Sequence, residues 1–428
     1  MNKKISIDII IVGFAIFATI FGAGNLIFPS ALGFSVGTGW TLAIIGFLFS
    51  GIMLPALAIV AVGNNGGSFE NISLKVGPVF SKIFYFGVMV LIIGLVGQPR
   101  IGAVTYELGV NPIIPDTSRI LVAALFYGVT ICLAINPANV VDKIGKYLTP
   151  ILLLVLGLII GKGIISPIGT PTGICAENPF VVGFYTGYEI GDALGATVVA
   201  TIFTAAVVAK GYSDSRQLSR VTAFSALVGA TLLFLVYGGL VYLGATASSV
   251  VEAGTERSAL LAAIVSNILG ESGMTVMGVA VIFACLTTAT GLSAAMAGYF
   301  NELSKGKLSY KAAVILVNVV AGIYSIVGVE TIMKIAMPVL MILYPVAIVL
   351  IILGVFDKYI PNRGAYIGAA YLTLFVNVLN TLAMYGIDVK FISWLPLSKH
   401  GFGWCVPAVV GLIIGLLVSK KKADGLAV

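Results

Sequence analysis

Phe21-Gly22-Ala23-Gly24-Asn25-Leu26-Ile27-Phe28-Pro29 lies in the middle of the first long apolar segment of the chain. An uninterrupted membrane helix is expected to carry Leu, Ile and Val here, whereas this stretch has two glycines and an asparagine ahead of a proline. The pattern predicts that the helix is broken. Backbone that leaves a helix at membrane depth must be satisfied by protein, water or ligand, so the break indicates a binding site. The alternative is that the glycines only let another helix pack closely.

The composition predicts a polytopic α-helical membrane protein. Of 428 residues, 59% are hydrophobic and only 10% are charged, and the mean hydropathy is +1.10. Segments long enough to cross a hydrocarbon core of roughly 30 Å can be drawn about twelve times. They are residues 8–33, 38–62, 79–99, 119–136, 145–166, 180–209, 221–246, 273–300, 311–327, 332–356, 364–386 and 402–419.

The basic residues predict the orientation in the cell membrane. With the N-terminus inside, 17 of the 24 Lys and Arg residues fall in cytoplasmic loops or termini, as the positive-inside rule requires. Both termini are therefore expected to be cytoplasmic. The net charge of +7 is spread over short loops that face anionic headgroups, so it indicates the lipid bilayer and no nucleic-acid partner.

Several function classes find no support in the sequence. The four cysteines have neither paired nor metal-like spacing, and the single histidine, His400, cannot form a metal site with another histidine. We find no nucleotide-binding loop and no acid–base or metal constellation, so neither an enzyme nor an ATP-driven pump is expected. No cofactor and no obligate protein partner are indicated. A channel would need a continuous polar pore, for which few polar residues are present.

A second interrupted segment lies at Gly183–Gly195, which carries four glycines and two carboxylates inside an apolar run. The two breaks are five helices apart, as a 5+5 inverted repeat with discontinuous helices one and six predicts. We expect one repeat in residues 1–166, a second in 167–356, and two additional helices in 357–428.

The broken helices offer what an amino acid zwitterion needs. Free N–H groups at the start of a resumed helix attract a carboxylate, and carbonyls at the end of the preceding helix accept an ammonium group or a small cation. The candidate substrate-binding residues are Ala23, Gly24, Asn25, Tyr185, Thr186, Gly187 and Tyr188.

Four charged residues are candidates for a gate or a proton-carrying group. Arg100 and Glu107 are two turns apart if the third helix continues past Pro99, although an arginine there could also reach the interface. Asp192 is a candidate either for the site or for a capping acid. Glu189 is less expected than Asp192, since an unpaired carboxylate near the membrane midplane costs free energy. Its alternatives are a gate, a group that binds an ion or proton, or a residue exposed to a water-filled cavity.

The eighth helix carries Ala284, Thr287 and Thr288. Two adjacent hydroxyls and a carbonyl one turn earlier are hard oxygen ligands of the kind that a small alkali cation takes. The alternative is that each threonine bonds only to the preceding turn of its own helix.

Taken together, the first-helix stretch, Pro99-Arg100 with Glu107, Gly187-Tyr188 to Asp192-Ala193-Leu194, and Thr288 with Gly291-Leu292 resemble the bacterial branched-chain amino acid:cation symporters. These are the BrnQ-like proteins of the LIVCS family, in the amino acid–polyamine–organocation superfamily. The resemblance covers essentially the whole chain. It implies the leucine-transporter fold, with 5+5 inverted repeats plus two helices, and uptake of Leu, Ile and Val coupled to sodium.

The resemblance also implies a sodium site. Its ligands are the carbonyls of Ala18, Phe21 and Ala284 and the hydroxyls of Thr287 and Thr288. The substrate carboxylate is expected at the amides near Ala23 and Gly24, and the side-chain pocket at Tyr188 and helices three and eight.

The sequence departs from the family pattern in helix six. Where Gly-Tyr-x-Thr-Met-Asp is expected, it has Gly-Tyr-Glu-Ile-Gly-Asp. The added Glu189 leaves open a proton-coupled or cation-independent transporter of amino acids, or of another small solute such as a nucleobase or polyamine. The mechanism that we expect in each case is alternating access.

Overall fold

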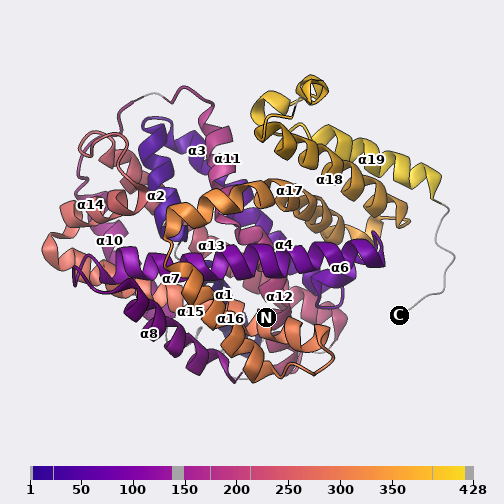
Figure 1. Ribbon diagram of the computed structural model, residues 1–428, viewed down its shortest axis with the longest axis horizontal. Coiled ribbons are helices and arrows are strands. Elements are labelled where there is room, and N and C mark those ends of the chain that lie inside the picture. Colours follow the sequence, from indigo (N-terminus) through magenta and orange to yellow (C-terminus); the bar gives the residue numbers. More distant parts are fainter. Residues whose placement is uncertain are drawn as a thin grey trace.

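The computed structural model describes residues 3–22, 24–136, 149–173, 175–212, 214–387 and 389–419, and every regular element in these ranges is a helix (Figure 1). The first half contains α1 (Lys3–Ile20), α2 (Gly24–Val36), α3 (Trp40–Phe47), η1 (Leu48–Met53), α4 (Leu54–Asn64), α5 (Phe69–Ser73), α6 (Pro78–Phe86), η2 (Gly87–Gly97), α7 (Gln98–Val104), η3 (Thr105–Val110), α8 (Arg119–Ala134) and α10 (Thr149–Ile165). The second half contains α11 (Pro179–Ile190), α12 (Asp192–Ala209), α13 (Ser215–Ala247), α14 (Arg257–Leu269), α15 (Glu271–Leu303), α16 (Tyr310–Ser325), α17 (Val329–Val355), η6 (Asp357–Tyr359), α18 (Gly364–Met384), η7 (Lys390–Trp394), η8 (Ser398–His400) and α19 (Cys405–Val418).

Within these ranges, seven helical stretches are long and apolar enough to cross a membrane, or eight if α1 and α2 form one span. Four of the predicted spans contain shorter helices, namely α8, α10, α16 and α19, of 14 to 17 residues. A helix needs about 20 residues to cross a bilayer core without tilt or thinning. The number of twelve spans therefore stays a prediction.

The first apolar segment is not one continuous helix. Helix α1 ends at Ile20, α2 begins at Gly24, and the two are bent by 70°. Pro29 lies inside α2 rather than at its start. The change of direction therefore falls at the glycines, as the sequence predicts.

The second interruption lies within the predicted segment Gly183–Gly195. Helix α11 continues to Ile190 and α12 begins at Asp192, so residues 185–188, nominated as binding backbone, lie inside α11. Gly191 joins them with φ of +83°, in the left-handed region that only glycine adopts at low cost. Gly187 lies inside α11, where a Cβ would come within 2.7 Å of the Gly51 amide nitrogen. Its role is close packing of α11 against η1.

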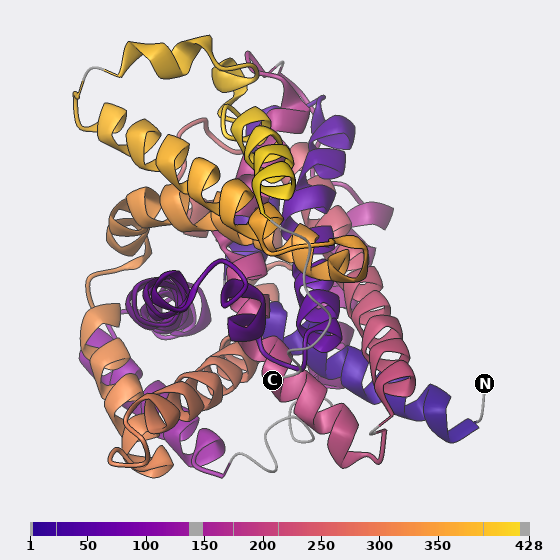
Figure 2. The ribbon, with the colours of Figure 1, turned by 90° about the vertical axis from the view of Figure 1, so that its right-hand side faces the viewer.

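The third span is longer than predicted, because helical backbone runs without interruption from Pro78 to Val110. Pro99 does not end it. The wider turns of η2 and η3 flank the proline on either side, where the missing amide hydrogen already interrupts the regular hydrogen-bond ladder. In Figure 1 this run crosses the whole molecule, and in Figure 2 it is seen along its axis.

The helices around the two breaks form the centre of the molecule. Helix α13 packs along both α1 and α2, and α12 packs along α4. The last two long helices, α18 and α19, pack on each other and border α17 at one side (Figures 1 and 2). The breaks are therefore surrounded by other helices.

The packing role of Gly187 is testable. Gly187→Ala should lower the stability of the folded protein by about 1–3 kcal/mol, because the added methyl group overpacks the contact with η1. Thermal unfolding in detergent measures the effect. The matched control is Gly298→Ala, since no atom lies within 4 Å of a Cβ built there. Equal unfolding temperatures for the two variants would contradict the assignment.

Candidate substrate and cation site

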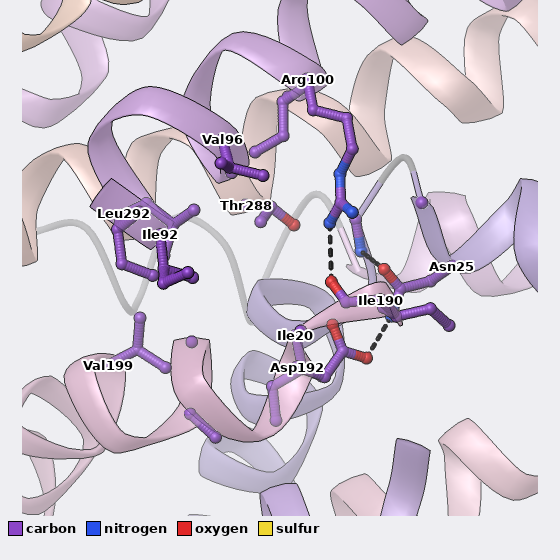
Figure 3. A pocket seen from close by; sticks show the side chains of 18 of the residues that line it. Ile20, Asn25, Ile92, Val96, Arg100, Ile190, Asp192, Val199, Thr288 and Leu292 are labelled. Atoms are coloured by element: carbon purple, nitrogen blue, oxygen red, sulfur yellow. Dashed lines mark hydrogen bonds between the residues drawn. The ribbon is translucent and has the colours of Figure 1, made fainter. Parts of the chain in front are cut away.

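A cavity of about 60 Å³ lies where the two breaks meet (Figure 3). It is lined by Thr19, Ile20, Gly22, Gly24 and Asn25 from the first break, by Ile92, Ile93, Val96, Gly97, Arg100 and Ile101 from η2 and α7, by Glu189, Ile190, Gly191, Asp192, Gly195, Ala196 and Val199 from the second break, and by Thr288, Leu292 and Leu340.

The lining separates into an aliphatic side and a polar side. Figure 3 shows Ile92, Val199 and Leu292 together on one side, and Arg100 and Asp192 on the other. An amphipathic ligand with a charged end and a branched hydrocarbon end would match both sides at once.

The polar side is built around Asn25, which is 2% exposed. The amide of Gly22 donates to Asn25 Oδ1 at 3.2 Å, and Asn25 Nδ2 donates to Asp192 Oδ2 and to the Tyr237 hydroxyl. The Tyr237 hydroxyl donates in turn to Asp192 Oδ2 at 3.0 Å. This network joins α2, α12 and α13. Asp192 therefore binds across the break, and its side chain makes no cap on α12.

Arg100 extends from α7 to the end of α11. Its Nη2 donates to the Ile190 carbonyl at 2.8 Å, and its Nη1 lies 3.5 Å from the Glu189 carbonyl. The guanidinium also lies over the Phe28 ring, 5.8 Å from its centroid. A cation is well placed at the C-terminal end of a helix, where carbonyls lack partners and the dipole is negative.

A second group of oxygens lies directly beside the cavity. The Thr287 hydroxyl is 2.8 Å from the carbonyls of both Ala18 and Ala284, and the Thr288 hydroxyl is 3.4 and 3.3 Å from the carbonyls of Ala18 and Phe21. The structure thus brings together all five residues predicted as cation ligands. Both threonines bond across to α1, so neither is restricted to its own helix.

The remaining acid at the second break, Glu189, faces outward from the polar cluster. Its Oε2 lies 3.2 Å from Nη1 of Arg257, at the start of α14. The Arg257 guanidinium also lies over the Phe28 ring, 4.9 Å from its centroid. Glu189 lines both this cavity and a larger one of about 950 Å³. The ion pair therefore lies at the boundary between the two cavities.

Several predicted residues lie away from the small cavity. Tyr185, Thr186 and Tyr188 line the larger cavity instead, and the Tyr188 ring packs on Tyr344 with centroids 4.0 Å apart. Glu107 accepts a hydrogen bond from the Val329 amide at 3.2 Å and does not line the cavity. Ala23 lies outside the described residues.

Sequence reasoning missed two members of these networks, Tyr237 and Arg257. Tyr237 is one of two tyrosines in the long apolar run of α13 and gives no signal at the level of sequence, because most such residues are packing residues. Arg257 is the first residue of α14, 68 residues from Glu189, and no sequence spacing connects the two.

The Asn25 network can be tested by removing its central residue. Asn25→Ala should destabilise the protein by about 1–3 kcal/mol, because the Gly22 amide and the Asp192 carboxylate each lose a buried partner. Thermal unfolding is the measurement. Asn267→Ala is the control, since Asn267 is exposed and bonds only to the Ala263 carbonyl of its own helix. An unchanged unfolding temperature for Asn25→Ala would contradict the network.

Comparison with known proteins confirms the resemblance seen in the sequence. The profile of the family "Branched-chain amino acid transport protein" matches residues 5–422. The branched-chain amino acid permease BraB of Bacillus subtilis is 36% identical over 96% of this chain and 95% of its own length. The permease BrnQ of the same organism is 36% identical over 98% of each chain. A branched-chain amino acid transport system 2 carrier protein of Pseudomonas aeruginosa is 32% identical over 96% of each.

Solved structures share the fold at low sequence identity. A Na⁺-coupled sialic acid symporter in a substrate-bound, outward-open state has a TM-score of 0.60 at 17% identity, with 96% of this chain and 90% of that chain covered. A nucleobase-cation-symport-1 family transporter in a closed conformation has a TM-score of 0.52 at 14% identity, with 96% and 91% covered. The chain therefore belongs to the family of branched-chain amino acid transport proteins, which are membrane transporters and not enzymes.

Proposed function

We propose that this chain imports leucine, isoleucine and valine across the cell membrane together with sodium, by alternating access. One observation carries the proposal: a group of oxygens suited to a cation lies beside a cavity that has one polar and one aliphatic side. The names of the B. subtilis and P. aeruginosa relatives support the substrate class, and the sodium-coupled structural neighbour supports the ion.

The substrate zwitterion would bind between the two breaks. Its carboxylate would meet the start of α2 at Gly24 and Asn25, where amides and the helix dipole favour an anion. Its ammonium group would take carbonyls at the end of α11. The aliphatic side chain would lie against Ile92, Val199 and Leu292. This orientation places each end of the ligand on the matching side of the cavity.

Sodium would bind among the oxygens of Ala18, Phe21, Ala284, Thr287 and Thr288. Carbonyls at the end of a half-helix are the usual sodium ligands in transporters with broken helices. None of the five contributes a negative charge, which suits a singly charged ion. In the structure, the hydroxyl hydrogens of Thr287 and Thr288 bond to carbonyls. When sodium binds, these hydrogens would turn away so that the lone pairs of the hydroxyl oxygens face the ion.

The first break would couple the two ligands. Its last carbonyls face the cation and its first resumed amides face the substrate, within a few residues of chain. Cation binding between α1 and α15 would favour one arrangement of these helices, and substrate binding would favour the next, so that differential affinity supplies the shift between states.

The membrane arrangement forms part of the proposal. It comprises about twelve spans, with repeats of the leucine-transporter type in residues 1–166 and 167–356 and two helices in 357–428. Both termini would be cytoplasmic. α1 with α2, and α11 with α12, would be the two discontinuous spans, with their interruptions at the binding site.

Sodium-driven uptake is the direct test. Purified protein in liposomes should accumulate labelled leucine when sodium is higher on the side of entry, because the ion gradient drives the coupled step. Isoleucine and valine should compete, and nucleobases and polyamines should not. No leucine uptake under any cation gradient would contradict the proposed function.

The cation site can be tested by Thr288→Ala. Loss of one oxygen ligand should raise the sodium concentration needed for half-maximal uptake by about tenfold, since such a contact contributes about 1–1.5 kcal/mol. Thr290→Ala is the matched control, because the Thr290 hydroxyl bonds only to the Leu286 carbonyl of its own helix. Equal sodium dependence in both variants would remove α15 from the site.

Proton coupling through Glu189 is the alternative. The ion pair with Arg257, with 3.2 Å between Glu189 Oε2 and Arg257 Nη1, supports a closing contact between α11 and α14 rather than a proton carrier. Glu189→Gln should therefore leave leucine uptake dependent on sodium and indifferent to an imposed pH gradient. Uptake driven by pH in the parent protein and abolished in Glu189→Gln would favour the alternative.

A further inference from the structure

Arg100 lies between two helix ends of opposite polarity (Figure 3). On one side, its Nη2 bonds to the Ile190 carbonyl at the negative end of α11. On the other side is the start of α2, where a Cβ built at Gly24 would lie 3.3 Å from both Cζ and Nη2 of Arg100. The guanidinium thus lies against the side-chain position of Gly24, at the positive end of α2.

The two contacts have opposite electrostatic signs. A cation at the C-terminal end of α11 is favourable, whereas a cation against the N-terminal end of α2 is unfavourable. Arg100 is only 8% exposed, so solvent does little to screen the second contact. An anion bound beside both the guanidinium and the first amides of α2 would interact favourably with each of them.

The two acids nearest to Arg100, Asp192 and Glu189, make their direct bonds to other residues. Asp192 Oδ2 accepts from Asn25 and Tyr237, and the Glu189 carboxylate pairs with Arg257. No ion pair joins Arg100 to an acid in the described ranges, and its buried Nε has no hydrogen-bond partner there. A buried donor without a partner is costly and uncommon. Arg100 therefore has an open donor and no ion-pair partner in the described ranges.

We propose that Arg100 recognises the carboxylate of the substrate, together with the first amides of α2. The inference rests on the proposed function and deepens it, because it makes the carboxylate an obligatory part of the ligand. A guanidinium presents parallel N–H groups that match a carboxylate, and such charge-assisted pairs are stronger than bonds to neutral groups. Backbone amides alone would distinguish a carboxylate from a neutral amide far less well.

The position of Gly24 fits this role. The missing side chain leaves backbone accessible beside the guanidinium, and Phe28 covers the adjoining face, with its Cδ2 at 3.5 Å from the Cβ position of Gly24. The bond from Arg100 to Ile190 holds the guanidinium in place from the other side. Substrate binding would therefore add an anion to a cation that is already positioned.

The test compares leucine with leucinamide, which keeps the ammonium group and the side chain but replaces the carboxylate by a neutral amide. Binding of each is measured on purified Arg100→Gln, Arg100→Lys and parent protein. The control is Arg220→Gln, which removes an exposed arginine near the start of α13 that does not line the cavity. The parent protein should prefer leucine.

Arg100→Gln should weaken leucine binding by about 10- to 100-fold, the range for a hydrogen-bonded charge. It should change leucinamide binding by less than about threefold, which removes the preference. Arg100→Lys keeps the positive charge but lacks the two parallel N–H donors of a guanidinium. Its leucine affinity should therefore lie between those of the parent protein and Arg100→Gln. It replaces Arg100→Gln in the test if that variant does not fold. Arg220→Gln should resemble the parent.

Two results would overturn the inference. One is unchanged leucine affinity in Arg100→Gln, and the other is an equal loss for leucine and leucinamide, which would mean that Arg100 only supports the site. Neither result bears on the proposed function if the parent protein still binds leucine. Absence of leucine binding by the parent protein would instead contradict the proposed function itself.

Discussion

The ends of four helices meet inside this protein, and their unpaired backbone groups determine what surrounds them. At the end of a helix, several amides or carbonyls lose their partners, and away from water each must find another or remain at a cost. At the first break Asn25 supplies a partner for the Gly22 amide, and Thr287 and Thr288 supply partners for the carbonyls of α1. At the second break Arg100 supplies one for Ile190.

These substitute partners also define the site. Because the Gly22 amide bonds to Asn25, the Ala18 carbonyl is left for the hydroxyls of α15. The same asparagine joins the first break to the second through Asp192. A ligand that replaced any one of these contacts would therefore alter the connection between helices that belong to opposite halves of the chain. That is the physical basis on which substrate and ion could favour different arrangements.

Composition and motifs predicted the helical membrane class, the position of the first break and the family, since apolar length and clustered glycines directly limit backbone conformation. The five predicted cation ligands converge, but they were found through the family resemblance and not through spacing. The second break falls within the predicted segment, but the sequence did not single out Gly191, because Gly187 and Gly191 look alike in sequence although one packs against η1 and the other adopts a left-handed turn. The roles of Tyr237 and Arg257 depend on tertiary contacts that no local pattern encodes.

An experimental structure of the protein with leucine and sodium bound is the most direct measurement of the central claim. The account predicts leucine between the two breaks, with its carboxylate in contact with both the start of α2 and Arg100, and its side chain against Leu292. It also predicts an ion among the oxygens of Ala18, Phe21 and Thr288. Leucine bound only in the larger cavity beyond Glu189, with both breaks unoccupied, would contradict it.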